Sequence, residues 1–492
     1  MNTNNQKGLR SGWTNAKVED ICIKLVGGGT PSREKNEYFD GDIIWLTPTE
    51  IPKNKIMEIK NSKEKITRLG LEASSATIIP SGTVLLTSRA TIGAVAIAGC
   101  EVSTNQGFAS FICSKAVNNR YLAYWLWGNK DLLESKAKGT TFKEISKSIL
   151  RELILPLPPL NEQKRIVFKL EELITKLDAG VEYLKKTQIL LNRYRQSVLK
   201  YAFEGKLTER WRMGNIGKME SSELNSNNTI EFHDKVSQEK LRQIAKESYP
   251  KEWLLSKLKD ACKLITKGES PNWQGYEYLA DGIAFIRSEN VLFGKLDIQK
   301  VVKIPEEFHM KLKRSQLKPN DVLINLVGAS IGRSATVPDF IENANINQAV
   351  ALIRVQENVN PKYLMYLLIS PKMQKRIHQS KVETARPNVS LTDIRELVIP
   401  IPKIVEQNQL VFLVENTISI INNIEANLRG YLVKARSLRI AILMDAFEGK
   451  LVSQDSNDES AEFLLERIRK ERGTVETIIR KEQNDINQKR VM

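Results

Sequence analysis

The hexapeptide AFEGKL occupies residues 202–207 and occurs again at residues 446–451, which is an offset of 244 positions. The same offset relates RELILPLP at residues 151–158 to RELVIPIP at residues 395–402. A repeat with a long period decides the architecture before any single helix or strand is assigned. The chain therefore contains two copies of one module.

Upstream of these segments the offset between the copies varies. It is 240, 239 and 242 for three pairs of matching residues, namely Trp13 and Trp253, Ile92-Gly93 and Ile331-Gly332, and Asn105-Gln106 and Asn347-Gln348. A constant offset means that no insertion was tolerated, whereas a varying offset is typical of surface loops. Each module therefore has a fixed part and a variable part. The Asn-Gln pair that recurs in both copies indicates a shared structural role.

The fixed part predicts a long helix in each copy. Pro156, Pro158 and Pro159 exclude a helix, and the proline-free segment after them lets a helix begin at Asn161. Apolar residues then recur at steps of four and three, which is a heptad pattern. The positions of this pattern are Ile166, Leu170, Leu173, Leu177, Leu184, Leu191, Tyr194, Val198 and Tyr201 in the first copy, and Leu410, Val414, Thr417, Ile421, Ile424, Leu428, Tyr431, Ala435, Leu438 and Ile442 in the second.

Two matching heptad patterns favour packing of the helices on each other. We expect the Ile, Leu and Val residues of both patterns to form the helix-pair interface. About forty residues make a rod of about 60 Å, and a two-fold-related pair within one chain packs antiparallel as an intramolecular coiled coil. The alternative is a pair of ordinary amphipathic helices in a bundle, which the copied register disfavours.

The variable part of each module, which we call a head, carries strand-like runs. These are residues 43–46, 83–86 and 108–112 in the first head and residues 283–286, 321–325 and 350–355 in the second. The predicted fold class is therefore α+β, with two mixed α/β heads in a pseudo-two-fold arrangement, separated by two long antiparallel helices.

The predicted boundaries divide the chain into six segments. These are a first head at 1–160, a first long helix at 161–208, a linker at 209–250, a second head at 251–404, a second long helix at 405–451 and a tail at 452–492. The polar linker is expected to hold one short helix at 236–246. In the tail, SAEFLLERIRKE at 460–471 predicts an amphipathic helix that docks on another subunit.

Composition limits the class of protein. A hydrophobic fraction of 41% and a charged fraction of 27% are typical of soluble folded proteins. A net charge of +16 favours a polyanionic partner, with nucleic acid first, an anionic membrane second and a merely basic protein as the plain alternative. No run of eighteen apolar residues and no apolar leader occur, so we expect a cytoplasmic protein that does not bind a membrane.

Enzymatic chemistry finds little support. The four cysteines lack CxxC spacing and only three histidines exist, which disfavours metal sites and disulfides. The turn GGGTPSR at residues 27–33 fits neither GxxxxGK[ST] nor GxGxxG, so no nucleotide cofactor is expected. Pro158-Pro159 lacks the aromatic residue of an amino-methyltransferase motif. Asp42 with Glu58-Ile59-Lys60 fits a magnesium nuclease only loosely. We expect a protein without catalytic residues, cofactor or metal.

Four motifs together resemble a known family, the DNA-specificity subunits of Type I restriction-modification systems. They are the GGTPS turn, SRATIGAVAI at 88–97 with its echo GASIGRSATV at 328–337, PLPPLNEQ at 156–163, and the closing AFEGKLT at 202–208. The resemblance covers nearly the whole chain. The second copy departs from the pattern, because its turn reads KGESP at 267–271 and Lys403 replaces a proline.

The resemblance implies a two-headed reader of double-stranded DNA. Each head would recognise one half of a split, asymmetric site, and the paired helices would set the gap and bind two copies of a methyltransferase subunit, with restriction (translocase or nuclease) subunits joining them. Two half-sites held about one DNA turn apart do need a rigid spacer between two readers.

Candidate DNA contacts are loop residues whose side chains suit bases or phosphates. They are Thr30, Ser32, Arg33, Thr47, Ser88 and Arg89 in the first head, and Lys267, Asn272, Arg287, Asn290, Asn325, Arg333 and Arg386 in the second. For each of them, a solvated loop residue or a turn cap is the competing explanation. For the whole chain, the competing function is a cytoplasmic coiled-coil scaffold that binds polyanions without reading bases.

Overall fold

The chain forms two compact units. The computed structural model describes residues 9–139, 143–215, 238–239, 241–243, 249–341, 343–379 and 387–470. Unit 1 comprises residues 1–184 and 430–492, and unit 2 comprises residues 185–429. Each unit therefore contains one head and one end of each long helix, so the units cut the chain differently from the six predicted segments. None of the helices in the described residues has the length and apolar character needed to cross a membrane.

The two long helices are α6 (Leu160–Phe203) and α14 (Ile404–Phe447), each of 44 residues. Both their first and their last residues are 244 positions apart, so the offset of the sequence repeat is kept through both helices. Each helix ends in the same way. Gly205 and Gly449 adopt φ values of +74° and +73°, the left-handed conformation that terminates a helix and that glycine adopts most easily. This explains the glycine of AFEGKL.

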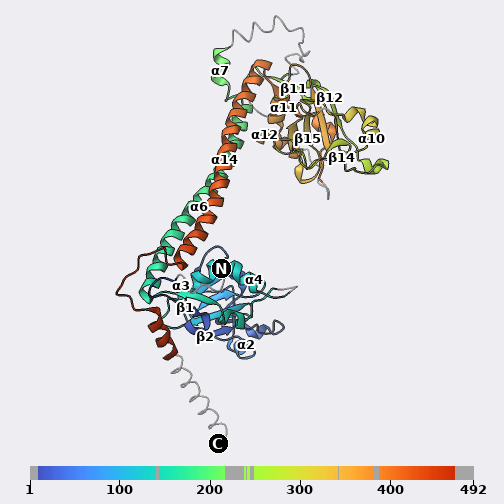
Figure 1. Cartoon of the computed structure of the whole chain (residues 1–492). Coiled ribbons are helices and arrows are strands. Elements are labelled where there is room, and N and C mark those ends of the chain that lie inside the picture. Colours follow the sequence, from blue (N-terminus) through green and yellow to red (C-terminus); the bar gives the residue numbers. More distant parts are fainter. Residues whose placement is uncertain are drawn as a thin grey trace. The chain divides into compact units, whose positions relative to one another are not determined.

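Within each unit the two helices lie side by side and run antiparallel (Figure 1). In unit 2, Arg195 of α6 donates hydrogen bonds to Asn422 (2.9 Å) and Glu425 (3.1 Å) of α14. In unit 1, Arg439 of α14 pairs with Asp178 of α6. The numbers of the paired residues 195 and 422, and 178 and 439, add to 617 in both units, as an antiparallel pair requires.

The enclosed face of each helix follows a heptad pattern whose members are buried or half-buried. These are Gln163, Val167, Leu170, Ile174, Leu177, Val181, Leu184, Gln188, Leu191, Arg195, Val198 and Ala202 in α6, and Gln407, Val411, Val414, Ile418, Ile421, Glu425, Leu428, Leu432, Ala435, Arg439, Ile442 and Ala446 in α14. The two sets are again related by 244 positions. Most of the predicted interface residues belong to them, while Ile166, Leu173 and Leu410 pack against the core of their own head.

The predicted interface positions Ile424 and Leu438 are wrong, because these side chains are 39% and 52% exposed. The enclosed positions beside them are Glu425 and Arg439. Both are charged, so a search for apolar residues alone moved the predicted pattern by one position.

The described residues of the first head form three sheets in unit 1. A five-stranded sheet has the order β2-β9-β6-β7-β4, a three-stranded sheet has the order β5-β3-β8, and β1 pairs with β10. Their bounds are β1 Thr14–Lys17, β2 Cys22–Gly27, β3 Phe39–Leu46, β4 Met57–Ile59, β5 Glu64–Ile66, β6 Val84–Thr87, β7 Val95–Ala98, β8 Ser103–Thr104, β9 Phe108–Cys113 and β10 Ile154–Leu157. The helices are α1 Val18–Ile21, α2 Arg68–Glu72, α3 Asn119–Gly128, α4 Lys130–Lys136 and α5 Lys147–Arg151.

The second head repeats this plan in unit 2. The sheet order is β12-β18-β15-β16, with β14-β13-β17 and the pair β11-β19 beside it. Their bounds are β11 Leu254–Lys257, β12 Cys262–Lys267, β13 Ile283–Ile286, β14 Val302–Ile304, β15 Val322–Asn325, β16 Ser334–Thr336, β17 Ala344–Ile346, β18 Val350–Val355 and β19 Val398–Ile401. The helices are α10 Glu306–Lys311, α11 Pro361–Leu368, α12 Pro371–Gln379 and α13 Leu391–Arg395. The mixed α/β heads and the strand-like runs of the sequence are thereby confirmed.

The start of each long helix is tied to its own head by the Glu-Gln pair of the repeat. The indole Nε1 of Trp13 donates to Glu162, and that of Trp253 donates to Glu406, both at 3.0 Å. The side chain of Gln163 spans Asn118 N and Pro158 O, and Gln407 bridges the matching backbone groups in unit 2. Burial raises the pKa of the Glu162 carboxyl, against the lowering effect of the Trp13 hydrogen bond.

The end of each long helix completes the core of a head. Phe447, at the end of α14, packs edge to face on Tyr121 of the first head, with ring centroids 5.5 Å apart. Phe203, at the end of α6, packs on Tyr363 of the second head at 5.4 Å. The alanines of both hexapeptides are fully buried in the same cores. AFEGKL therefore recurs because it fills an equivalent site in each unit.

The tail returns to the first head of its own chain. Ala461, Leu464 and Ile468, on the helical segment 461–470, belong to the core of that head. Arg165 of α6 pairs with Asp458 at 2.6 Å, and Ala461 N donates to Gly12 O at 3.0 Å. The prediction that this helix docks on another subunit is wrong, because its apolar face is already covered within unit 1.

The segment after the first hexapeptide behaves similarly in unit 2. Thr208 and Arg212, the latter on α7 (Glu209–Gly214), both contact Glu406. Leu241 is buried in the core of the second head, and Gln238 pairs with the backbone of Leu255. Of the helix predicted at 236–246, residues 238–239 and 241–243 are described and are helical; the others lie outside the described residues.

Candidate nucleic-acid interface

Both heads are organised around the turn that contains the recurring Asn-Gln pair. In the first head Asn105 N donates to Leu46 O, and its side-chain Oδ1 accepts from Gly107 N at 2.9 Å. In the second head Asn347 N donates to Ile286 O, and its Oδ1 accepts from Ala349 N at 3.1 Å. The shared structural role predicted for the pair is thereby confirmed for its asparagine.

The glycine turn lies directly against the Asn-Gln turn. A Cβ atom on Gly28 would come within 2.1 Å of the carbonyl oxygens of Thr104 and Asn105, and one on Gly268 within 1.6 Å of Ile346 O. No other residue fits at such a close backbone approach. The glycines of both heads therefore serve packing and bring the following loop beside the Asn-Gln turn.

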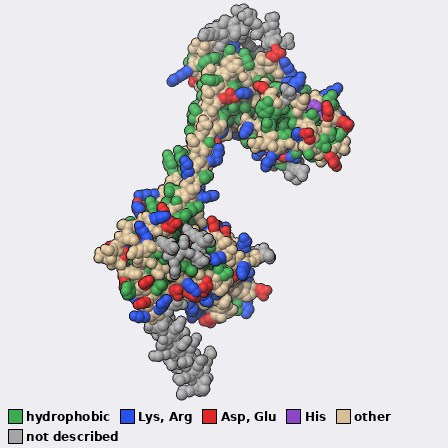
Figure 2. Space-filling model, viewed as in Figure 1, with side chains coloured by type: hydrophobic (Ala, Val, Ile, Leu, Met, Phe, Trp, Pro, Cys, Tyr) green, Lys and Arg blue, Asp and Glu red, His purple; other side chains and the backbone are tan. Residues whose placement is uncertain are grey.

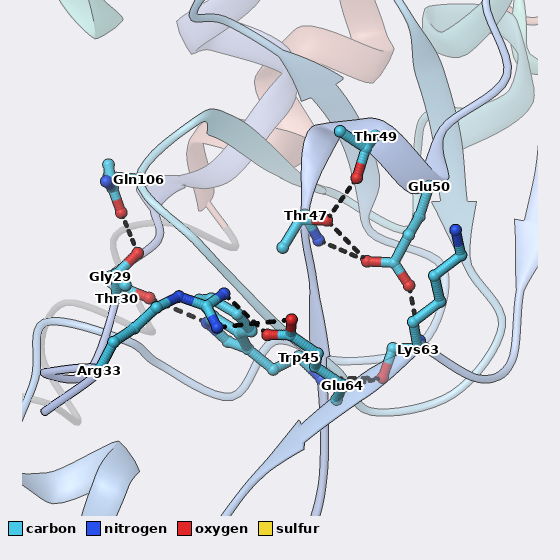
Figure 3. A network of polar contacts seen from close by, with 11 residues as sticks. Gly29, Thr30, Arg33, Trp45, Thr47, Thr49, Glu50, Lys63, Glu64 and Gln106 are labelled. Atoms are coloured by element: carbon cyan, nitrogen blue, oxygen red, sulfur yellow. Dashed lines mark hydrogen bonds and ion pairs between the residues drawn. The ribbon is translucent and has the colours of Figure 1, made fainter. Parts of the chain in front are cut away.

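In the first head this arrangement gathers Thr30, Arg33 and Thr47 into one polar network (Figure 3). The hydroxyl of Thr30 donates to Gln106. The guanidinium of Arg33 pairs with Glu64 at 2.8 Å and lies over the rings of Phe39 and Trp45. Arg33 is thus held in place while 60% of its side chain stays exposed. Ser32 beside it is also exposed.

Thr47 acts as a turn cap. Its hydroxyl and its backbone N–H both hydrogen-bond the carboxylate of Glu50, at 3.0 and 2.8 Å, and thereby form a capping box over the turn Pro48–Glu50. Glu50 also accepts from Lys63 N at 2.7 Å. The competing explanation for Thr47, a turn cap, is the one that these bonds support.

Ser88 and Arg89 lie on the loop after β6. Ser88 is 4% exposed, and its hydroxyl donates to Gly107 O. Arg89 is exposed and lies 3.7 Å from the carboxylate of Glu144. The next residue, Ala90, has a φ of +60° and donates its backbone N–H to Lys143 O. In the second head the equivalent bond, to Pro387 O, is made by Gly328, whose φ is +73°. Of the two candidates, only Arg89 is available to a ligand.

In the second head, Lys267 at the end of β12 and Asn272 in the loop that follows are both exposed. The sequence interpretation missed their neighbour Trp273, whose side chain is 78% exposed. The offset of 240 that relates Trp13 to Trp253 also relates Arg33 to Trp273, and this was the signal in the sequence. The two heads therefore place chemically different side chains at the same position of the same loop.

The other candidates of the second head differ in accessibility. Arg287 and Arg333 are half-buried, and Arg287 pairs with Glu289. Asn290 is 3% exposed and bonds Arg287 N and Asp297 O; Asn325 is fully buried and donates to Ser288 O at 2.7 Å. Arg386 lies outside the described residues.

The prediction of a DNA contact is wrong for Ser88, Asn290 and Asn325. Their side chains are enclosed, and each donates a hydrogen bond to a backbone oxygen of its own head. The exposed or half-buried candidates stay predictions.

The loose nuclease motif does not form a site. Glu58 pairs with Arg120 at 3.2 Å and with Lys60 at 3.4 Å, so its carboxylate is neutralised by cations of the chain itself. Within the described part of the chain, no three His, Cys, Asp or Glu side chains are grouped to hold a metal ion.

Comparisons with known proteins agree with this architecture. The family described as "Type I restriction modification DNA specificity domain" matches residues 10–186 and 250–429. The EcoBI specificity subunit of Escherichia coli is 31% identical over 367 residues, which are 72% of this chain and 72% of that protein. The EcoKI specificity subunit of Escherichia coli K12 is 25% identical over 495 residues, covering 94% of this chain and 96% of that protein.

Solved structures share the fold. A structure described as "Structural basis underlying complex assembly and conformational transition of the type I R-M system" has a TM-score of 0.62 at 17% identity, over 90% of this chain and 99% of that chain. The HsdS subunit from Thermoanaerobacter tengcongensis has a TM-score of 0.55 at 19% identity, over 91% and 100%. The chain therefore belongs to the family of Type I restriction-modification DNA specificity subunits, the non-catalytic components of these complexes.

Proposed function

We propose that this chain reads a two-part, asymmetric sequence of double-stranded DNA, one half with each head. In this proposal the long helices fix the gap between the halves and dock two copies of a methyltransferase subunit, to which restriction subunits add. The complex acts in the cytoplasm, beside the DNA that it reads.

The observation that carries the proposal is one scaffold with two different surfaces. Four strands of the larger sheet, the Asn-Gln turn and the glycine contact are equivalent in the two heads, yet the loop next to that turn presents Arg33 in one and Trp273 in the other. A common frame with different exposed side chains is what two readers of unlike half-sites need. The net charge of +16 favours attraction to the phosphate backbone.

The continuous helices support the spacer role. Each has 44 residues, its start is fixed by a buried Trp-Glu hydrogen bond, and its end is buried in the core of a head. A helix that is fixed at both ends can act as a spacer whose length is set by its number of residues.

Exposed apolar side chains on these helices support partner docking (Figure 2). Phe168 of α6 and Phe412 of α14 are 244 positions apart, and they are 72% and 58% exposed. The pair Ile189 and Val433, at the same offset, is 55% and 66% exposed. Large apolar side chains at the surface mark interaction sites. Their repetition gives each unit one phenylalanine and one aliphatic residue, which suits two identical partners.

The test is DNA binding and methylation by the complete complex. The chain, purified with its methyltransferase subunit, should bind one bipartite duplex at least about 10³-fold more tightly than a duplex with one half scrambled. Genome-wide methylation profiling should find the same bipartite motif when the chain is present and should lose it when the chain is absent. Equal, strongly salt-dependent binding to both duplexes would instead support the polyanion scaffold.

The spacer role needs a variant that keeps the helix pairing. Inserting seven residues after Leu184 of α6 and seven after Leu432 of α14 preserves both heptad patterns. Each helix then grows by about 10 Å, and the gap of the methylated motif should grow by about three base pairs. The control is the same insertion in α6 alone, which breaks the match between the helices and should abolish activity. An unchanged gap in the double insertion would refute the spacer role.

Docking is tested by Phe168→Glu together with Phe412→Glu. The variant should lose its methyltransferase subunits in size-exclusion chromatography. Phe340→Glu is the matched control, because Phe340 is 69% exposed but lies on the second head, and this variant should assemble normally.

A further inference from the structure

Gln106 and Gln348 are identical in two heads whose loops otherwise differ, and the packing of the chain does not account for them. Their asparagine neighbours are explained, because Asn105 and Asn347 each close the turn with a side-chain hydrogen bond. The glutamine side chains do not close the turn. Gln106 is exposed, and Gln348 is half-buried and makes no side-chain hydrogen bond to any described residue.

The two glutamines occupy equivalent positions. The backbone around them is held by the same bonds in each head: Ser88 N to Gly107 O at 2.8 Å in the first, and Leu326 N to Ala349 O at 2.8 Å in the second. The glycine turn crosses the residue before each asparagine in both heads. Gln106 and Gln348 are therefore attached at equivalent positions of equivalent turns.

In the first head the amide of Gln106 is oriented. The hydroxyl of Thr30 donates to Gln106 Oε1, so the amide oxygen faces Thr30 (Figure 3). The amide nitrogen keeps both N–H donors for a ligand, and the oxygen keeps a second lone pair. The amide therefore offers a donor and an acceptor side by side.

We propose that Gln106 and Gln348 make the same contact in the two half-sites, each reading one adenine through its N6 and N7 edge. This rests on the proposed function, since it concerns the DNA that each head reads. A residue that both heads share contacts a base that both half-sites share. Arg33 and Trp273, which differ between the heads, contact parts of the half-sites that differ. Thr30 is a positioning residue that sets the orientation of the Gln106 amide.

The chemistry favours a base over a phosphate. A neutral amide gains little from an anion, and Lys or Arg are the usual phosphate ligands. Glutamine matches adenine because its oxygen accepts from the N6 amino group while its nitrogen donates to N7.

The experiment is selection of duplexes from a randomised library by the full chain with its methyltransferase subunit. The wild type should select adenine at one fixed position in each half-site. Gln106→Ala should lose that preference in the first half-site by roughly 5- to 140-fold, and Gln348→Ala should lose it in the second. In each variant the untouched half-site reports that the protein is folded and binds DNA.

A substitution that alters the base preference sharpens the test. Gln106→Glu keeps the acceptor and removes the donor, so the preferred base should change from adenine towards cytosine, whose N4 amino group a carboxylate accepts. Thr30→Val should weaken the adenine preference of the first half-site alone, without abolishing binding.

Other outcomes overturn the inference in distinct ways. A wild type that selects no bipartite motif refutes the proposed function itself. A wild-type motif that Gln106→Ala and Gln348→Ala leave unchanged refutes only the adenine contacts. Weaker binding of these variants to every sequence, with a smaller salt dependence, would assign the glutamines to the phosphate backbone.

Discussion

The two heads rest on the same buried contact, but they stabilise it differently. In unit 2 the carboxylate of Glu406 is fully buried and accepts from Trp253, Thr208 and the guanidinium of Arg212. In unit 1 Glu162 accepts from Trp13 through Oε2, and its Oε1 is buried without a hydrogen-bond partner among the described residues. The repeat thus keeps the tryptophan and the glutamate and leaves the surroundings free to change.

The difference comes from the segments that follow AFEGKL. Residues 208–212 bring a hydroxyl and an arginine to Glu406, whereas the tail places Asp458 on Arg165 instead. A buried carboxylate with few donors favours its proton, and burial raises the pKa of Glu162. Equivalent residues in two copies can therefore differ in energetics although their first contact is the same.

The largest expected effect is the loss of Glu406. Glu406→Ala removes the carboxylate partner of the Arg212 guanidinium, whose side chain is 11% exposed, and leaves this charge only Gly205 O and the Thr208 hydroxyl. It should therefore lower the free energy of unfolding of unit 2 by about 3–5 kcal/mol. Glu162→Ala leaves only an indole N–H without an acceptor and should cost unit 1 about 1–3 kcal/mol. Urea unfolding, followed by tryptophan fluorescence, measures both.

The matched control for this comparison is the double variant Glu406→Leu with Arg212→Met. The double variant removes both charges, so its free energy of unfolding should be higher than that of Glu406→Ala. If Glu406→Ala and Glu162→Ala lowered the free energy of unfolding equally, Arg212 would add nothing to the contact in unit 2.

A smaller effect is the pH dependence of unit 1. The pKa of Glu162 is raised by burial, so the folded state holds its proton more tightly than the unfolded chain does. This contribution to stability is fully present below the ordinary glutamate pKa and is lost as the pH rises through the raised value. The free energy of unfolding of the wild type should therefore fall relative to Glu162→Gln over that range. Titrating both proteins between about pH 4 and 8 tests this, and a constant difference would contradict it.

The smallest effect concerns the loop after β6. Ala90 holds a left-handed conformation that the second head gives to glycine, and for alanine this conformation is strained. Ala90→Gly should stabilise unit 1 by about 0.5–1 kcal/mol, and Gly328→Ala should destabilise unit 2 by about 1 kcal/mol. A Cβ on Gly328 meets nothing within 4 Å, so the second effect isolates the backbone. Thermal unfolding of the wild-type chain and of the two variants decides whether the two changes in stability have opposite signs.

The sequence predicted the helices better than their contacts. The constant offset and the missing prolines located α6 and α14 within a few residues. The interface was predicted one position off at Ile424 and Leu438, because Glu425 and Arg439 occupy the enclosed positions and a charged residue gives no apolar signal. The tail helix was recognised as amphipathic, but periodicity cannot say which surface covers an apolar face.

The candidate interface was harder to predict for a related reason. Thr47, Asn290 and Asn325 have side chains that suit DNA, yet the same side chains also close turns, and the use of each depends on tertiary contacts that the sequence does not reveal. Trp273 was missed because the candidates were chosen among charged, amide and hydroxyl side chains, and aromatic side chains were not considered. Comparing the two heads position by position would have found it.

The division of the chain into units also determines which unit is completed first during translation. Unit 2 is made of one continuous stretch, residues 185–429, whereas unit 1 needs residues from both ends. The first head leaves the ribosome early, but Ala446, Phe447 and Leu464, which complete its core, follow more than two hundred residues later. At about 5–20 residues per second, synthesis from Leu157, the end of β10, to Ala446 takes on the order of 15–60 s. During translation the second head is therefore finished before the first, and the nascent first head waits with part of its apolar core uncovered.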